Sequence, residues 1–240
     1  MANERLYPAE AADPFCLREG EAARLLAGHP WRRFAVLGDS IAEGLGDPTP
    51  GYPDEPWSDR IAAELTLAQP DLAYLNLGAS NSTAARVRAR QLDAALAFSP
   101  GLALVACGGY DVLRFSYDLA GTDAELRAII AALTGRGCDV ITAGLFDGSC
   151  APGLSAALRE PLRYRLHELS RRMRAISADL GTLHVELTWH PASREPGMYS
   201  KDLRHGTRRG HAIAAAESIR VLGTYLGARP VPAAPDSAAR

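Results

Sequence analysis

Short apolar runs alternate with amphipathic segments along most of this chain. Five runs of five or six residues have the length and apolar character of buried strands: 33–37, 72–77, 102–107, 139–143 and 183–187. Apolar residues also recur at helical spacing in the segments 19–26, 57–68, 84–97, 123–133, 161–180 and 209–226. Strands that are buried on both faces and alternate with helices form a parallel sheet with right-handed crossovers. The pattern therefore predicts a three-layer α/β/α sandwich around a five-stranded parallel sheet.

The same pattern divides the chain into three parts. Residues 1–30 form a lead-in with one short helix, which ends at the stop signal Gly28-His29-Pro30. Residues 31–228 hold all five predicted strands and form a single domain without an internal repeat. Residues 229–240 are rich in Pro and Ala, so we expect a loose tail. A length of 240 residues suits one α/β domain with short tails.

Composition and charge narrow the classes of partner. The chain has 26 Lys and Arg against 28 Asp and Glu, and neither sign collects in a long block. We therefore expect no nucleic-acid partner and no attraction to an anionic membrane. No run of about twenty apolar residues is present, and acids and prolines occupy the start where a secretory signal needs a basic and then an apolar stretch. These features indicate a cytoplasmic protein, and they leave its oligomeric state open.

Neither a cofactor nor a metal ion is expected. No predicted turn between a strand and a helix reads GxGxxG or GxxxxGK[ST], which are the patterns of nucleotide-binding loops. The histidines do not combine with other ligands at the spacing of a metal site. The cysteines make no CxxC pair and are best interpreted as reduced thiols: Cys16, Cys107, Cys138 and Cys150.

The candidate chemistry begins where the first predicted strand ends, at Gly38-Asp39-Ser40. A strand that stops at such a turn holds a hydroxyl at the carboxyl edge of the sheet, where open α/β folds bind their ligands. Taken alone, Asp and Ser at this place are also common turn and helix-cap residues. Near the other end of the chain, however, Asp202 and His205 supply an acid and a base three residues apart. A serine hydroxyl becomes a nucleophile beside a histidine that a carboxylate orients, so a hydrolytic site is favoured.

The chain resembles the SGNH hydrolases, also called the GDSL esterase/lipase family, in two sequence blocks. Residues 38–40 are similar to the first block of that family, and residues 202–205, followed by Gly210-His211, are similar to the last block. The resemblance extends over about residues 31–227 and implies the flavodoxin-like α/β/α fold. It also implies hydrolysis of an acyl ester through an acyl-enzyme. In that mechanism Ser40 is the nucleophile, His205 is the general base and then the acid, and Asp202 orients the imidazole. The substrate-binding residues that we assign on this basis are Asp39, Gly109 and Trp189.

Two positions depart from the family pattern, and both concern the oxyanion hole. Asn81 stands where the second family block has a glycine that donates its backbone N–H, and Tyr110 replaces the asparagine of the third block. Asn81 can keep the backbone N–H and add a side-chain amide, and Tyr110 can donate through its phenol. Alternatively, the hole is lost, which leaves weak hydrolysis or a different reaction. We expect an atypical oxyanion hole made by Ser40, Asn81 and Tyr110.

The predicted loops around this site mix aromatic and small residues, which suits a small or medium acyl ester. Within these loops, His190 is a candidate for the pocket wall and Arg114 is a candidate partner for a carboxylate or phosphate. Two alternatives remain open. The same site can transfer the acyl group of a specialised metabolite to another acceptor, or promote elimination. The chain can also be a catalytically weak binding protein that retains the fold.

Overall fold

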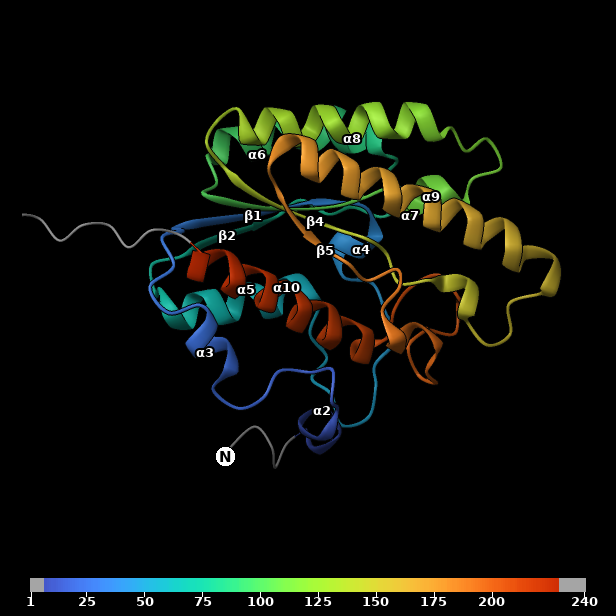
Figure 1. Cartoon of the computed structure of the whole chain (residues 1–240), viewed down its shortest axis with the longest axis horizontal. Helices are drawn as coiled ribbons and strands as arrows, with labels where there is room; N and C mark the ends of the chain where they lie inside the picture. Colours follow the sequence, from blue (N-terminus) through green and yellow to red (C-terminus); the bar gives the residue numbers. More distant parts are fainter. Residues whose placement is uncertain (1–6, 229–240) are drawn as a thin grey trace, which may run out of the picture.

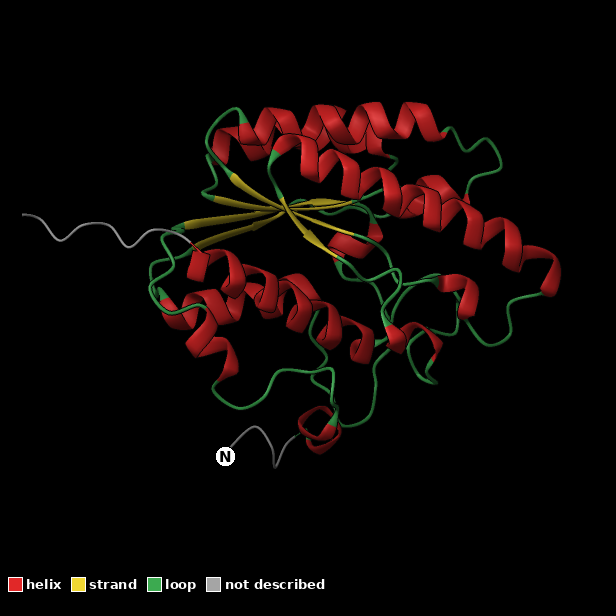
Figure 2. Cartoon of the chain, viewed as in Figure 1, coloured by secondary structure: helices red, strands yellow, loops and turns green. Residues whose placement is uncertain are grey.

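The computed structural model describes residues 7–228, so the predicted tail at 229–240 lies outside the described residues. A five-stranded parallel sheet in the order β2-β1-β3-β4-β5 lies between two layers of helices (Figures 1 and 2). The predicted α/β/α sandwich is confirmed. The strands are β1 (Arg33–Gly38), β2 (Ala73–Asn76), β3 (Leu102–Ala106), β4 (Asp139–Ala143) and β5 (Leu183–Val185).

Helices cover both faces of the sheet, as Figure 1 shows. One layer contains α3 (Glu21–Leu25), α5 (Trp57–Ala68) and α10 (Arg208–Ala228), and the other contains α6 (Ala84–Phe98), α8 (Leu119–Thr134) and α9 (Ala156–Leu180). Five shorter elements were not predicted, because three to five residues are too few to show a helical period. They are α2 (Pro8–Ala12), α4 (Ser40–Glu43), α7 (Gly109–Leu113), η1 (Gly148–Cys150) and η2 (Pro191–Arg194).

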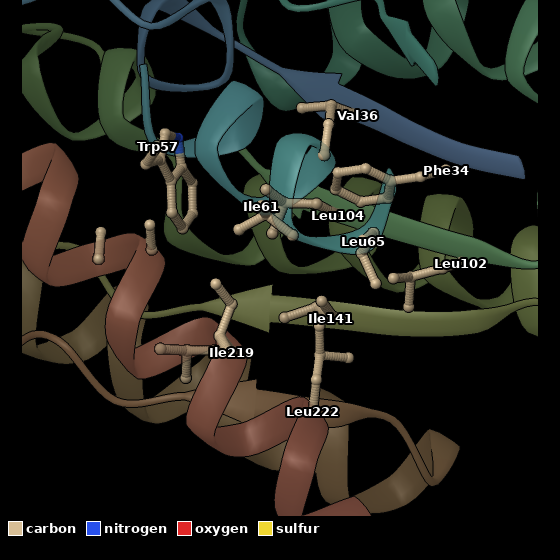
Figure 3. Close-up of a cluster of buried hydrophobic side chains, with 14 of the residues drawn as sticks. Phe34, Val36, Trp57, Ile61, Leu65, Leu102, Leu104, Ile141, Ile219 and Leu222 are labelled. Carbon is tan, nitrogen blue, oxygen red and sulfur yellow. The ribbon is translucent and has the colours of Figure 1, made fainter. Parts of the chain in front are cut away.

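The strands are buried on both faces, and alternate residues supply the two halves of the core. In β1, Phe34 and Val36 pack into the cluster beneath α5 and α10, which Figure 3 shows. Ala35 and Leu37 point the other way, into the cluster beneath α6, α8 and α9. All four side chains are fully buried. Burial on both sides explains why this strand is a continuous apolar run rather than an alternating one.

Two helices, α8 and α9, begin at least one full turn earlier than the sequence pattern predicts. The structure starts α8 at Leu119 instead of 123, because the Asp118 carboxylate accepts a hydrogen bond from the N–H of Gly121 and caps the helix. The helix α9 begins at Ala156 in the structure, whereas the sequence pattern predicts that it begins at Pro161. Pro161 lies inside this helix and is exposed, so it removes one hydrogen-bond donor near the helix end without burying an unpaired group.

The order of the strands decides where a ligand can bind. In the order 2-1-3-4-5, the chain reverses its winding direction between β1 and β3, and a crevice opens beyond the carboxyl ends of these two strands. Gly38 ends β1 with a φ of +153°, and a Cβ at this position would lie 1.9 Å from the carbonyl oxygen of Ala106 on β3. The glycine lets the two strand ends approach closely, just before Asp39 and Ser40.

Candidate active site

Asp39 shapes the turn that presents Ser40. It is the N-cap of α4, where its Oδ1 accepts a hydrogen bond from the N–H of Ile41 at 3.0 Å. Its Oδ2 accepts from the N–H of Tyr110 at 3.1 Å, so this carboxylate joins the ends of β1 and β3. The side chain is fully buried, and burial raises its pKa to about 6. Asp39 therefore orients two loops and does not line the cavity described below.

Ser40, His205 and Asp202 lie in a continuous hydrogen-bonded row. The Nε2 of His205 is 2.8 Å from the Oγ of Ser40, and its Nδ1 is 2.6 Å from the Oδ2 of Asp202. The Oδ1 of Asp202 accepts from the backbone N–H groups of Arg204 and His205 at 3.0 and 3.2 Å. Partial burial acts to raise the pKa of Asp202, but these hydrogen bonds hold it below its ordinary value. An ionised carboxylate thus faces the imidazole, which in turn faces the hydroxyl.

The loop that carries His205, residues 200–207, is held by Asp47 and is called the histidine loop below. The N–H of Asp47 donates to the Oγ of Ser200 at 2.7 Å, and its Oδ2 accepts from the N–H of Lys201 at 2.8 Å. Its carbonyl oxygen accepts from the N–H of Arg208 at 3.0 Å. Nothing local in the sequence marks Asp47, because a lone aspartate in a Gly/Pro-rich loop carries no signal of its partner Ser200, which is 153 residues away.

A cavity of about 270 Å³ opens beside Ser40 and His205. Apolar side chains from both helical layers and from the loops after the strands line most of it, including Ile41, Leu45, Trp57, Leu145, Phe146, Leu162, Leu166, Leu187 and Leu203. Gly109, Tyr110 and Asn81 also line it. The arrangement places an apolar site directly against the row of polar groups.

Asn81 and Tyr110 both belong to the wall of this cavity. Asn81 has a φ of +57°, a left-handed conformation that asparagine tolerates better than most residues. The preceding residue, Ser80, is tied to α4 because its N–H donates to Glu43 at 2.7 Å. The N–H of Tyr110 is bonded to Asp39, so only the phenol of Tyr110 is available to a ligand. Within residues 7–228, neither this phenol nor the Asn81 amide has a protein partner.

Two ring side chains that the sequence offered for the pocket, Trp189 and His190, lie outside the cavity lining. Trp189 does not line the cavity: its ring packs against His167 at 5.3 Å and beneath the Arg174 guanidinium at 4.9 Å, which differs from the substrate-binding place expected for it. His190 packs edge-on against Phe15 and also lies outside the lining.

His211 is buried in the cavity wall, on the first turn of α10. Its Nδ1 accepts from the N–H of Trp57 at 3.1 Å, and its Nε2 donates to the carbonyl oxygen of Leu45 at 3.1 Å. Burial lowers the pKa of His211 to about 4. Because both ring nitrogens are occupied and the ring is neutral, His211 is a structural residue and not a second base.

The part of the chain that the structure describes contains no group of three His, Cys, Asp or Glu side chains placed to hold a metal ion. The four cysteines are unpaired, and no described helix is long and apolar enough to cross a membrane.

Known proteins give two findings about this chain. The sequence profile of the GDSL-like lipase/acylhydrolase family matches residues 36–213, which is more than half of the chain. No curated protein matches the sequence significantly. The match begins within β1 and extends past the histidine loop, so it includes Ser40, Asp202 and His205.

Several solved structures share the fold. Axe2, an acetylxylan esterase from Geobacillus stearothermophilus, is 20% identical with a TM-score of 0.65, covering 82% of this chain and 95% of its own. LAE5, an α/β hydrolase from the metagenome of Lake Arreo, Spain, is 19% identical with a TM-score of 0.64, covering 82% and 96%. TesA is 23% identical with a TM-score of 0.63, covering 79% and 97%.

These structural likenesses establish the fold, and the profile match establishes the family. The profile match confirms the family resemblance noted in the sequence, and the solved structures confirm the fold that it implies. The chain belongs to the GDSL-like lipase/acylhydrolase family and is an ester hydrolase of that family.

Proposed function

We propose that this protein cleaves a small or medium acyl ester by nucleophilic attack from Ser40, with His205 as base and Asp202 as its orienting carboxylate. The observation that supports this most is the row of hydrogen bonds from Ser40 Oγ through the imidazole to Asp202, at 2.8 and 2.6 Å. Both distances lie within the reach that proton transfer requires. The apolar cavity beside Ser40 suits the acyl or alcohol part of an ester.

The reaction proceeds in two halves. Ser40 Oγ attacks the ester carbonyl while Nε2 of His205 takes its proton, and the ionised Asp202 stabilises the imidazolium that forms. The tetrahedral intermediate collapses, His205 returns the proton to the leaving alkoxide, and an acyl-enzyme remains on Ser40. A water molecule then repeats the sequence with His205 as base, and releases the carboxylic acid and free Ser40.

The oxyanion of each intermediate needs hydrogen-bond donors. Ser40 is the first residue of α4, and the N–H groups in the first turn of a helix have no partner within that helix. We assign this N–H, the Asn81 backbone or side-chain N–H and the Tyr110 phenol to the oxyanion hole. Supporting this assignment, the side-chain polar groups of Asn81 and Tyr110 have no protein partner in the described chain, and both residues line the cavity with Ser40.

The direct test is the Ser40→Ala variant. Without the nucleophile, hydrolysis of 4-nitrophenyl butyrate should fall by about a thousandfold or more, to the level left by binding alone. A fluorophosphonate probe should label the wild type and leave this variant unlabelled. Ser116→Ala is the matched control, because Ser116 is exposed and lies outside the cavity lining. Equal rates in wild type and the Ser40 variant would rule out the proposed mechanism.

Acyl transfer is the second candidate function. The mostly apolar lining favours it, because a site that excludes water lets an alcohol or amine compete for the acyl-enzyme. It is recognised by product analysis in the presence of acceptor alcohols, where ester product would exceed free acid. An unreactive Ser40 in the labelling experiment would instead indicate a binding protein.

A further inference from the structure

The cavity beside Ser40 has an unbalanced charge. Its lining consists of apolar, glycine, hydroxyl, amide and imidazole groups, with one permanently charged side chain, Arg204. No aspartate or glutamate is among the lining residues. A single arginine among otherwise uncharged lining residues favours an anion within its reach, because an apolar wall of low dielectric weakens the attraction less than water does.

The backbone of Arg204 is well fixed. Its N–H donates to the Oδ1 of Asp202 at 3.0 Å. In the sequence, Arg204 lies between Asp202, the orienting carboxylate, and His205, the base. The next residue, His205, contacts Ser40. The side chain of Arg204 therefore starts from a defined point next to the reacting groups, although the residue itself is exposed.

The guanidinium of Arg204 has no acid to pair with. Across residues 7–228 it makes no hydrogen bond or ion pair, in contrast to Arg208 and Arg209 just after it, which bind Asp54 and Asp13. The nearest carboxylate in the sequence, Asp202, is engaged by the imidazole of His205 and by two backbone N–H groups. A free guanidinium is a donor for two oxygens at once, which matches a carboxylate or a phosphate.

We propose that the substrate carries an anionic group, a carboxylate or a phosphate, which Arg204 binds at the cavity edge while the apolar part of the substrate occupies the cavity. This inference rests on the proposed ester hydrolysis at Ser40, and it defines the substrate as an amphiphilic anionic ester. Arg114, which the sequence offered for this role, is exposed on the loop after α7 and does not line the cavity. Arg204 is thus the specificity-determining residue.

The test compares esters that differ only in charge. The first pair places the charge on the acyl side: 4-nitrophenyl hexanoate is neutral and mono-4-nitrophenyl adipate is anionic. The second pair places it on the alcohol side: the hexanoyl ester of methyl 4-hydroxybenzoate is neutral and the hexanoyl ester of 4-hydroxybenzoate is anionic. A third anionic ester, of 4-hydroxyphenyl phosphate, separates phosphate from carboxylate. The wild type should favour at least one anionic ester over its neutral partner by about tenfold in kcat/KM, as expected for one hydrogen bond to a charged group.

Three variants locate the cause of that preference. In Arg204→Gln, the ratio of kcat/KM for the anionic ester to kcat/KM for the neutral ester should fall to about one. Arg204→Lys should keep part of the preference, because lysine retains the positive charge but lacks the paired donors of the guanidinium. Arg114→Gln is the control and should keep the full ratio. The ratio should also fall with added salt.

Two results would overturn the proposal while leaving ester hydrolysis intact. One is a wild type that cleaves neutral esters through Ser40 and prefers none of the anionic ones, and the other is an Arg204→Gln variant with the wild-type ratio. If no ester is cleaved and Ser40 stays unlabelled, the proposed function itself fails, and the substrate class fails with it.

Discussion

Asn81 and Tyr110 are the two residues that we assign to the oxyanion hole beside Ser40, and both line the same cavity as Ser40. The left-handed conformation of Asn81 is one that glycine adopts without strain, so replacing the side chain does not require the backbone to move. Tyr110 is anchored through its backbone N–H to the buried Asp39, which leaves the phenol free to meet a ligand. The two side chains can therefore be removed separately with little effect on the loops that carry them.

We expect Asn81→Gly and Tyr110→Phe each to lower kcat for 4-nitrophenyl butyrate by about tenfold or more, with KM changed by less than about twofold. The reason is that an oxyanion donor acts chiefly in the transition state. Steady-state kinetics of the two variants measure this. Tyr117→Phe is a suitable control, because it removes a phenol that does not line the cavity. An unchanged kcat in either variant would remove that side chain from the oxyanion hole.

At the scale of elements, the histidine loop depends on a second loop, residues 44–56, and this loop depends on the lead-in. The phenol of Tyr52 donates to Asp13 at 2.7 Å, and the N–H of Glu10 donates to the carbonyl oxygen of Gly51 at 3.1 Å. Asp13 is buried and also pairs with Arg209 at 2.6 Å. The lead-in precedes residue 36, where the family match begins, and through these contacts it supports the second loop.

Asp47 is the contact through which this support reaches His205. Asp47→Ala should lower kcat by about ten- to hundredfold, because small displacements of a catalytic group are costly, while KM stays within about twofold. Phosphonate labelling of Ser40 should slow in parallel. Asp47→Asn should retain most activity, because its amide oxygen can still accept from Lys201. A fall in melting temperature with unchanged kcat and labelling would mean that Asp47 only stabilises the fold.

At the scale of the whole molecule, two buried groups oppose each other in the dependence of stability on pH. The pKa of His211 is lowered from 6.5 to about 4, so the unfolded chain binds the extra proton in this window and stability falls as pH falls. The pKa of Asp39 is raised from 3.8 to about 6, so the folded chain binds the extra proton and stability rises as pH falls. The two effects largely cancel in the wild type.

Variants separate the two contributions. When the pH falls from 7 to 5, the free energy of unfolding of His211→Gln should decrease by about 2 kcal/mol less than that of the wild type. The free energy of unfolding of Asp39→Asn should decrease by about 1 kcal/mol more than that of the wild type. Urea unfolding at both pH values measures these differences. If both variants follow the pH dependence of the wild type, neither group titrates as described.

The sequence by itself determined the layers and most of the elements. Strands buried on both faces must be continuous apolar runs, and long helices must show a 3.6-residue period, so β1 to β5 and the six predicted helices can be recognised without tertiary contacts. The identity of Ser40, Asp202 and His205 as candidates also came from local blocks of sequence. These features are local because neighbouring residues on one strand or helix share the same environment.

Only the tertiary structure decided which distant residues meet. Strand order brought the ends of β1 and β3 together, and packing between elements placed Asp47 beneath the histidine loop, turned Trp189 away from the cavity and left Arg204 at its edge. The exposed start of α9 likewise accepted Pro161 inside a helix. Each of these outcomes depends on side chains that are far apart in the chain, and the local pattern of apolar and polar residues contains no information about such neighbours.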